Sequence, residues 1–187
     1  MLIVIVATPG AADANSFVAE AEAIAYAATR LNLAGWQTTT GATATENEKK
    51  ALIEATRELD RLRYVGHRAS STQRLSWPRV FAAVPDPALT AHAVDAAPLG
   101  IVTYGADEIP LALKEATIEL AMEFLRAGTT DLAAYPQEAD VIRKRVDVIE
   151  TQWQPGRRPL GLARFPRVLA LIAPLLAGAG RRTVVRT

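Results

Sequence analysis

The 187 residues of the chain are half hydrophobic and carry a net charge of +1, which suits one domain with a sizeable core. Cysteine is absent, which excludes disulfides, thiolate catalysis and cysteine-based zinc sites. The apolar runs at residues 2–7 and 168–179 are shorter than the ~20 residues of a membrane-spanning helix, so we expect a soluble protein with no membrane partner.

The near-neutral total hides a division of charge along the chain. Residues 143–187 contain ten basic and two acidic residues, a net charge of +8, whereas residues 1–142 carry −7. Such asymmetry indicates an arm that binds nucleic acid or an acidic protein surface. The arm could also fold back onto its own acidic body, or lie on the acidic face of a neighbouring copy.

In chain order, the first expected elements are a buried strand and a helix. The continuous apolar run at residues 2–7 has the length of a strand. A turn follows, with Asp13, Asn15 and Ser16 as candidate helix caps. Apolar residues at spacings of three and four then predict a helix over residues 16–33. Its inner face is expected to hold Phe17, Ala21, Ile24, Ala28 and Leu31.

A second helix is predicted to begin after Thr45. Thr45 and Glu48 have the spacing of a capping box. The inner face of this helix is expected to hold Leu52, Ile53, Thr56, Leu59 and Leu62. Its outer face holds charged residues, among them Lys49, Glu54 and Glu58, and both glutamates are placed to pair with nearby basic residues.

Residues 80–106 form a long connection without a clear hydrophobic period. Its prolines prevent a long helix, and residues 100–104 could form a short strand. We expect this connection either to contact partners or to be poorly ordered.

A third helix is the strongest prediction. Asp107 can cap it, and Pro110 falls in its first turn, where the missing N–H does no harm. Two apolar lines cover most of its circumference, so it should be central and largely buried. The remaining stripe, Glu115, Glu119 and Glu123, is either a solvated acidic ridge or a surface that meets arginines of a neighbouring copy.

The C-terminal region is predicted to hold a strand or hairpin at residues 140–153, a turn with Arg157 and Arg158, a short helix at 165–176 and a basic tail. The tail contains Arg181, Arg182 and Arg186 and could add a strand to a partner's sheet. The expected fold is therefore mainly α: a small helical bundle with a few short strands and an extended C-terminal arm. Residues 1–135 would form the core, with the long loop 80–106, and residues 136–187 the arm.

No catalytic motif is apparent. The sequence contains neither a nucleophile elbow nor a Walker-type phosphate loop. His67 and His92 are the only histidines, and neither belongs to a carboxylate cluster. We predict that the protein is not an enzyme and holds no cofactor or metal.

The segment around residues 54–79 carries the most distinctive pattern. Proline disfavours the α region for the residue before it, so Trp77 should be extended, with its ring buried either in the core or at an interface. Arg79 would then bond either local carbonyls or a partner, and Trp and Arg are enriched at interface hot spots. Five arginines, with Tyr64 and His67 among them, could also bind nucleic acid, with Tyr64 and Trp77 offering stacking: Arg61, Arg63, Arg68, Arg74 and Arg79.

Residues 73–79, Gln-Arg-Leu-Ser-Trp-Pro-Arg, resemble the Q-x-L-x-W-P-R signature of a family of small tailed-phage proteins. Members are described either as head–tail connector (adaptor, head-completion) proteins or as DnaT-like single-stranded-DNA-binding proteins. Residues 13–18, Asp-Ala-Asn-Ser-Phe-Val, and the helices at 51–60 and 109–125 are similar to further family motifs. The resemblance covers about residues 10–126.

The resemblance implies a connector protomer, a subunit of a dodecameric ring beneath the portal that joins capsid to tail. Its partners would be further copies of itself, the portal protein, a tail or second connector protein, and the genomic DNA in the channel. It would lie in the virion neck, and in the host cytoplasm during assembly. The alternative is a DnaT-like single-stranded-DNA-binding protein.

The interface residues that we expect are Trp77, Arg79, Glu115, Glu119, Glu123, Arg157, Arg158, Arg181, Arg182 and Arg186. We further expect Arg79→Ala and deletion of residues 181–187 to impair assembly more than folding.

Overall fold

The computed structural model describes residues 2–41, 43–85, 102–130, 141–145, 150–153 and 161–178. In chain order these residues form α1 (Glu20–Ala28), α2 (Glu46–Asp60), β1 (His67–Arg68), β2 (Arg79–Val80), α4 (Leu111–Ala127), β3 (Val141–Arg145), β4 (Glu150–Trp153), η2 (Gly161–Arg164), α5 (Pro166–Ile172) and η3 (Ala173–Leu175). The fold is mainly α with few short strands, as the sequence predicts. None of the helices in these ranges is long and apolar enough to cross a membrane.

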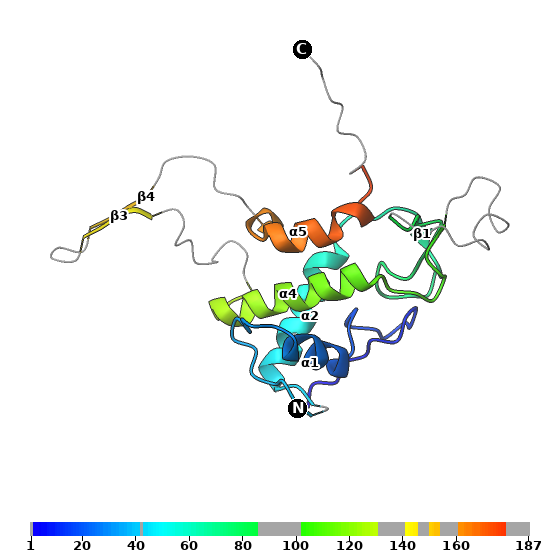
Figure 1. Cartoon of the computed structure of the whole chain (residues 1–187). Coiled ribbons are helices and arrows are strands. Elements are labelled where there is room, and N and C mark those ends of the chain that lie inside the picture. Colours follow the sequence, from blue (N-terminus) through cyan, green and yellow to red (C-terminus); the bar gives the residue numbers. More distant parts are fainter. Residues whose placement is uncertain are drawn as a thin grey trace, which may run out of the picture.

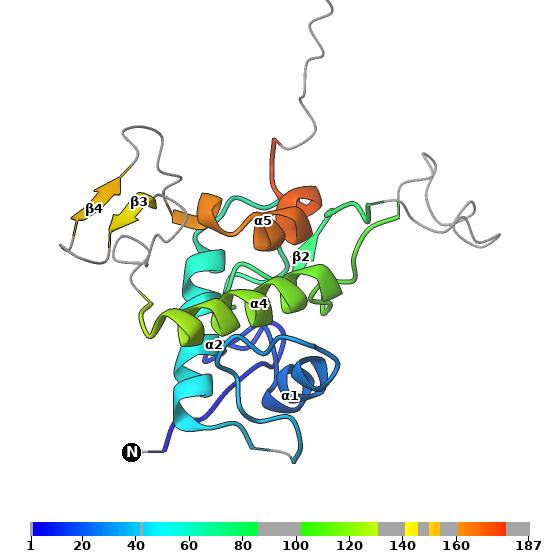
Figure 2. The ribbon, with the colours of Figure 1, turned by 60° about the vertical axis from the view of Figure 1, so that its left-hand side comes forward.

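The central element is α4. It lies between α1 and α5, and α2 crosses it (Figure 1, Figure 2). Leu113, Leu120 and Phe124 of α4 are buried at 0 to 2% exposure, which confirms the prediction of a largely buried central helix. Leu111 is the exception at its first turn, where the side chain is 69% exposed.

The ends of α4 are set by backbone conformation. Pro110 occupies the N-cap position and Gly128 ends the helix in the left-handed region, at φ 66°. The prediction that Asp107 caps the helix is wrong, because the helix begins only after Pro110. Proline fits this position since the first N–H groups of a helix have no intrahelical acceptor.

The capping box of α2 is confirmed. The Thr45 hydroxyl accepts from the Glu48 N–H at 3.3 Å, and the Thr45 N–H donates to the Glu48 carboxylate at 2.7 Å. Lys49, which we expected on the outer face, is instead buried at 3% exposure. Its ammonium is held by the Ile3 carbonyl at 3.3 Å and by the Glu20 and Glu46 carboxylates.

The N-terminal segment is not the predicted strand. Asn15 replaces a neighbouring strand: its side chain accepts from the Val6 N–H and donates to the Val4 carbonyl, both at 2.8 Å. The Ile3 N–H donates to Glu46 at 3.2 Å. Side chains thus satisfy an extended backbone whose Leu2 and Val4 side chains remain exposed.

The first helix is shorter than predicted. The Ser16 hydroxyl accepts from the Val18 N–H and donates to the Val18 carbonyl, a local turn that competes with helix formation. The helix therefore begins at Glu20, and it ends at Ala28. Leu31, predicted on its inner face, lies beyond the end and is fully exposed.

The region after α4 contains a hairpin and a helix, and the helix contributes to the core. Strands β3 and β4 pair as an antiparallel hairpin, one of the two alternatives predicted for residues 140–153, with Val141 opposite Trp153. The predicted helix at 165–176 is confirmed as α5 and η3, and α5 packs on α4. Residues 161–178 thus belong to the main core rather than to a separate arm, because Val168, Ile172 and Leu175 are buried in it.

The ends of the long connection at residues 80–106 lie against each other. Ala83 and Thr103 form an isolated β-bridge, and the Tyr104 N–H donates to the Ala82 carbonyl at 2.9 Å. Of the short strand predicted at residues 100–104, the described residues 102–104 contain this bridge, and residues 86–101 lie outside the described ranges.

Candidate nucleic-acid interface

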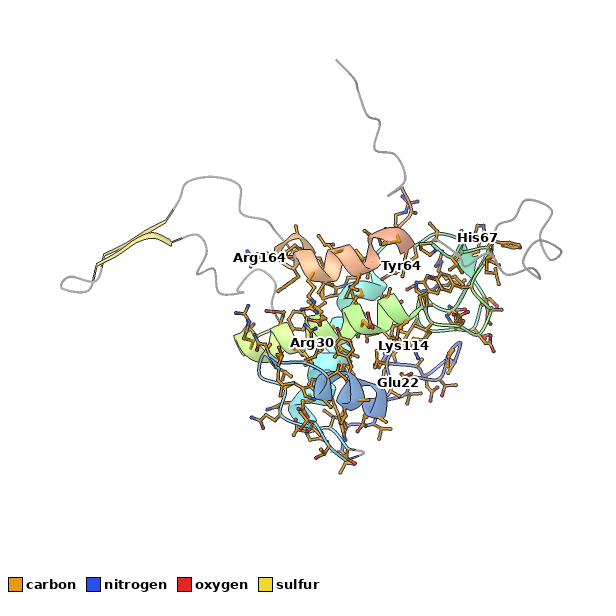
Figure 3. All side chains as sticks on the ribbon, in the orientation of Figure 1. Glu22, Arg30, Tyr64, His67, Lys114 and Arg164 are labelled. Carbon is orange, nitrogen blue, oxygen red and sulfur yellow. The ribbon has the colours of Figure 1, made fainter. Side chains whose placement is uncertain are left out.

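One end of the body, residues 61–85, contains five arginines and no aspartate or glutamate. We call this segment the basic corner. Its frame is the ribbon of β1 and β2, in which His67 lies opposite Val80 and Arg68 opposite Arg79. Figure 3 shows His67 at this end of the molecule and Arg164 at the other, beside α5.

Arg79 is the internal tie of the basic corner. Its guanidinium donates to four backbone carbonyls at 2.6 to 3.4 Å, those of Tyr64, Val65, Gly66 and Ser76. Burial, with a smaller contribution from the charge of Arg68, lowers the pKa of Arg79. Of the two roles weighed from the sequence, the structure shows the bonds to local carbonyls.

Trp77, expected at an interface, lies inside the protomer at 1% exposure. Tyr64 and Tyr104 contact its ring edge-on, with centroids 5.9 and 5.6 Å away. Tyr64 is buried too, its hydroxyl donates to the Leu59 carbonyl at 2.8 Å, and burial raises its pKa. The expectation that Trp77 and Tyr64 offer stacking surfaces is therefore wrong.

The residues of the Q-x-L-x-W-P-R motif build the basic corner. The Gln73 side chain donates to the carbonyls of Leu75 and Pro78, at 2.8 and 3.1 Å, and accepts from the Ser70 N–H at 2.8 Å. Gln73, Leu75, Trp77 and Pro78 are all buried. The motif thus specifies a local architecture, and its side chains are used within the protomer.

The exposed aromatic residue of the basic corner is Phe81, which sequence reasoning missed. It is 77% exposed and has a left-handed backbone, at φ 57°. Its ring lies edge-on to the His67 imidazole, with centroids 6.5 Å apart. The sequence offers no periodic signal for this exposure, because Phe81 lies just after β2 with a left-handed backbone.

Gly66 allows the chain to pass beneath Phe81. Its φ is +72°, and a Cβ atom there would lie 2.4 Å from the Val80 carbonyl oxygen and 2.8 Å from the Ala82 nitrogen. Only glycine fits such an approach. The backbone at Phe81 therefore packs closely against Gly66, whose carbonyl accepts a hydrogen bond from Arg79.

Three arginines of the basic corner are exposed and form no ion pair within the described part of the chain: Arg63, Arg68 and Arg74. Arg61 differs, because it pairs with Glu58 of α2 at 2.7 Å. The Arg63 carbonyl accepts from the Ala177 N–H at 2.8 Å, so the C-terminal segment passes beside it. The predicted interface residues Arg157, Arg158, Arg181, Arg182 and Arg186 lie outside the described residues.

The glutamates of α4 differ from these exposed arginines, because one of them is buried and paired within the chain. Glu119 is 8% exposed, and its carboxylate receives the Tyr26 hydroxyl at 2.6 Å, Arg30 at 3.1 Å and Arg167 at 3.3 Å. Burial and this hydrogen bond raise the pKa of Tyr26 to about 12. The arginines that meet Glu119 thus belong to the same chain, and Glu119 is not part of a solvated acidic ridge.

The other two glutamates of the predicted stripe are partly exposed. Glu123 pairs with Arg126 of its own helix at 2.7 Å. Glu115 lies near Tyr26, where its charge contributes to the raised pKa of that hydroxyl. An interface role for these two residues stays a prediction. Among the described residues, no group of three or more histidines and carboxylates could hold a metal ion.

Comparison with protein families gives a match over the whole chain. A family model described as "Putative DnaT-like ssDNA binding protein" matches residues 1–187. Comparisons with curated proteins and with solved structures give no match. The head–tail connector prediction is corrected by this finding, because the matched family is a single-stranded-DNA-binding family. The dodecameric ring, the portal and tail partners and the virion assembly role lose their support with it. The chain belongs to the family of DnaT-like single-stranded-DNA-binding proteins.

Proposed function

We propose that the protein binds single-stranded DNA through the basic corner, without catalytic turnover. The observation that carries the proposal is a set of exposed arginines, Arg63, Arg68 and Arg74, in a segment free of carboxylates and in a chain of this family. None of the three forms an ion pair with another described residue. Binding to a nucleic-acid backbone takes its free energy mainly from cations that replace the counterions of phosphates.

Several other cations of the described residues are paired with carboxylates within the protomer. Arg57 pairs with Glu54, Lys114 with Glu22, and Arg126 with Glu123. Figure 3 shows the Lys114 and Glu22 side chains between α4 and α1, away from His67. A paired cation must give up its carboxylate before it binds a phosphate, so the basic corner offers the stronger attraction.

The arginines of the basic C-terminal residues 143–187 have different roles in this proposal. Arg167 folds back onto Glu119 of its own body, as one of the sequence alternatives has it. The described segment ends at Gly178, directly after the residue that bonds Arg63, and Arg181 and Arg182 follow in the sequence. We infer that these arginines add to the charge available to the DNA backbone.

The test is equilibrium binding of the full chain to a fluorescent oligodeoxythymidine at several salt concentrations. We expect affinity to fall steeply with salt, with a slope of about 0.7 for each phosphate contact. The triple variant Arg63→Gln, Arg68→Gln, Arg74→Gln should bind more weakly and with a shallower slope. The matched control is Arg57→Gln with Arg126→Gln, which removes two arginines that pair with glutamates outside the basic corner and should change little.

Two results would overturn this proposal. One is wild-type protein that shows no salt-sensitive affinity for the oligonucleotide. The other is a triple variant that folds normally and binds as tightly as the wild type. The locations predicted from the connector interpretation are not part of the proposal.

A further inference from the structure

We propose that Phe81 and His67 form a stacking platform for an unpaired nucleobase, which makes the basic corner prefer single strands over duplex DNA. This inference rests on the proposed function. It adds a contact to the nucleobase to the contacts with phosphate. It begins from the exposure of Phe81, whose ring is 77% exposed although the core has room for larger rings such as Trp36 and Trp77.

The backbone at Phe81 indicates that this exposure is built in. A bulky residue at positive φ is uncommon, and such strain persists only where the surroundings over-determine it. Here the surroundings are Gly66, which lets a second backbone approach to contact distance, and Arg79, which ties the carbonyls around it. Strain held in this way is typical of functional sites.

The ring geometry suits a flat ligand. The planes of Phe81 and His67 lie at 79°, with centroids 6.5 Å apart. An edge-on contact covers at most one ring face, so an open face remains for a base to lie against. Aromatic side chains stack on any base, which makes such a contact independent of sequence.

The charges around the ring favour a nucleic acid over an apolar protein groove. Arg68 and His67 are exposed on the ribbon, with His67 opposite Val80, the residue before Phe81, and the segment holds no carboxylate. A protein-docking patch would need contiguous apolar surface, whereas an isolated ring among cations matches a base with its phosphates. In a duplex the base faces are already stacked, so the platform would add nothing there.

The test compares two variants of Phe81 for binding to oligodeoxythymidine and to a duplex of equal length. Phe81→Ala removes the ring, and Phe81→Asn removes it with a residue that tolerates positive φ. Both should bind the single strand about 10-fold more weakly, with an unchanged salt slope and unchanged duplex affinity. Phe81→Trp keeps a large aromatic ring and should bind the single strand as tightly as the wild type. Leu111→Ala is the control, because it removes another exposed large side chain, 69% exposed, outside the basic corner.

The outcomes separate this inference from the proposed function. If the wild type binds the single strand and both Phe81 variants bind equally well, the platform is wrong and the function stands. If the variants lose single-strand and duplex affinity together, Phe81 acts through the fold and the platform is also wrong. If the variants instead change the oligomeric state with DNA affinity intact, the ring contacts a protein. If the wild type does not bind at all, the proposed function fails first.

Discussion

The basic corner and the acidic stripe of α4 are both dense in like charge, but the protein uses them differently. In the stripe, Glu119 is enclosed by Tyr26, Arg30 and Arg167, so its charge joins α1, α4 and the start of α5. In the basic corner a single arginine, Arg79, is used internally. The other exposed arginines of the corner, apart from Arg61, have no ion pair within the described ranges.

The difference shows that a run of charge in a sequence does not reveal which charges are available. An exposed ion pair contributes little to stability, but it does reduce the charge that a ligand meets. The comparison therefore predicts that disrupting internal ties lowers stability, whereas removing unpaired arginines lowers DNA affinity.

Gly66→Ala should be the most damaging change, with a loss of about 4 kcal/mol in the free energy of unfolding. Its Cβ would lie 2.4 Å from a backbone oxygen that cannot move without breaking the ribbon. Urea denaturation measures the loss. Gly128→Ala is the control, since it has a similar φ of +66° and open space around its Cβ. It should cost only about 1 kcal/mol, and equal losses would contradict the close approach.

Arg79→Ala should destabilise the protein by about 3 kcal/mol, because it leaves the carbonyls of the basic corner without donors. This replaces our expectation that the change would impair assembly more than folding. Arg68→Ala, on the opposite strand, should leave stability within about 0.5 kcal/mol and weaken DNA binding. Thermal unfolding and oligonucleotide binding of both variants decide the matter. Equal stability of the two variants would show that the hydrogen bonds of Arg79 to backbone carbonyls do not stabilise the protein.

Glu119→Gln should cost about 2 kcal/mol, since an amide cannot balance the two arginines that converge on this buried position. Arg30 and Arg167 are partly exposed, which keeps the loss below that of a fully buried pair. Glu123→Gln, which breaks only the exposed pair with Arg126, should cost less than about 0.5 kcal/mol. Chemical denaturation of both variants measures the contrast, and similar values would remove the distinction within the stripe.

Glu48 should give the smallest effect, visible as pH dependence. Burial alone would raise the pKa of its carboxyl, but hydrogen bonds from Thr38, Thr45 and Gln37 outweigh burial and lower it. A lowered folded-state pKa stabilises the protein above the ordinary value of 4.5, and this stabilisation is lost as the pH falls through the lowered pKa.

Glu48→Gln should therefore be less stable than wild type at pH 7 by about 1 kcal/mol. The gap between the two should narrow as the pH falls below 4.5. Denaturation midpoints across this range test the prediction, with exposed Glu46→Gln as a comparison. A gap that does not change with pH would contradict it.

Local signals in the sequence predicted much of the fold. The capping box of Thr45 and Glu48 and the apolar lines of α4 depend on residues three or four apart, which are neighbours on any helix. The Q-x-L-x-W-P-R pattern led to the connector prediction, which the family comparison contradicts. The same local reasoning failed for residues 2–7, where an apolar run has no strand to pair with and Asn15 takes its hydrogen bonds.

The candidate site was harder to predict from the sequence than the fold. Reasoning from the sequence identified the basic residues of the corner but chose Trp77 and Tyr64 as its stacking rings, whereas Phe81 is the exposed one. Large aromatic residues beside arginines look alike in a sequence whether they face solvent or core. Burial depends on contacts between distant segments, such as the one that sets Tyr104 against Trp77.

Helix periodicity, capping and composition are local properties, so a helical protein with a basic segment could be predicted from the sequence alone. Which charges are paired and which stay available to a ligand depends on the tertiary fold. Ion pairs such as Glu119 with Arg30 join residues far apart in the chain, and the fold alone sets their distance. The same long-range packing buries Trp77, and the ties at Gly66 and Arg79 leave Phe81 exposed beside unpaired arginines.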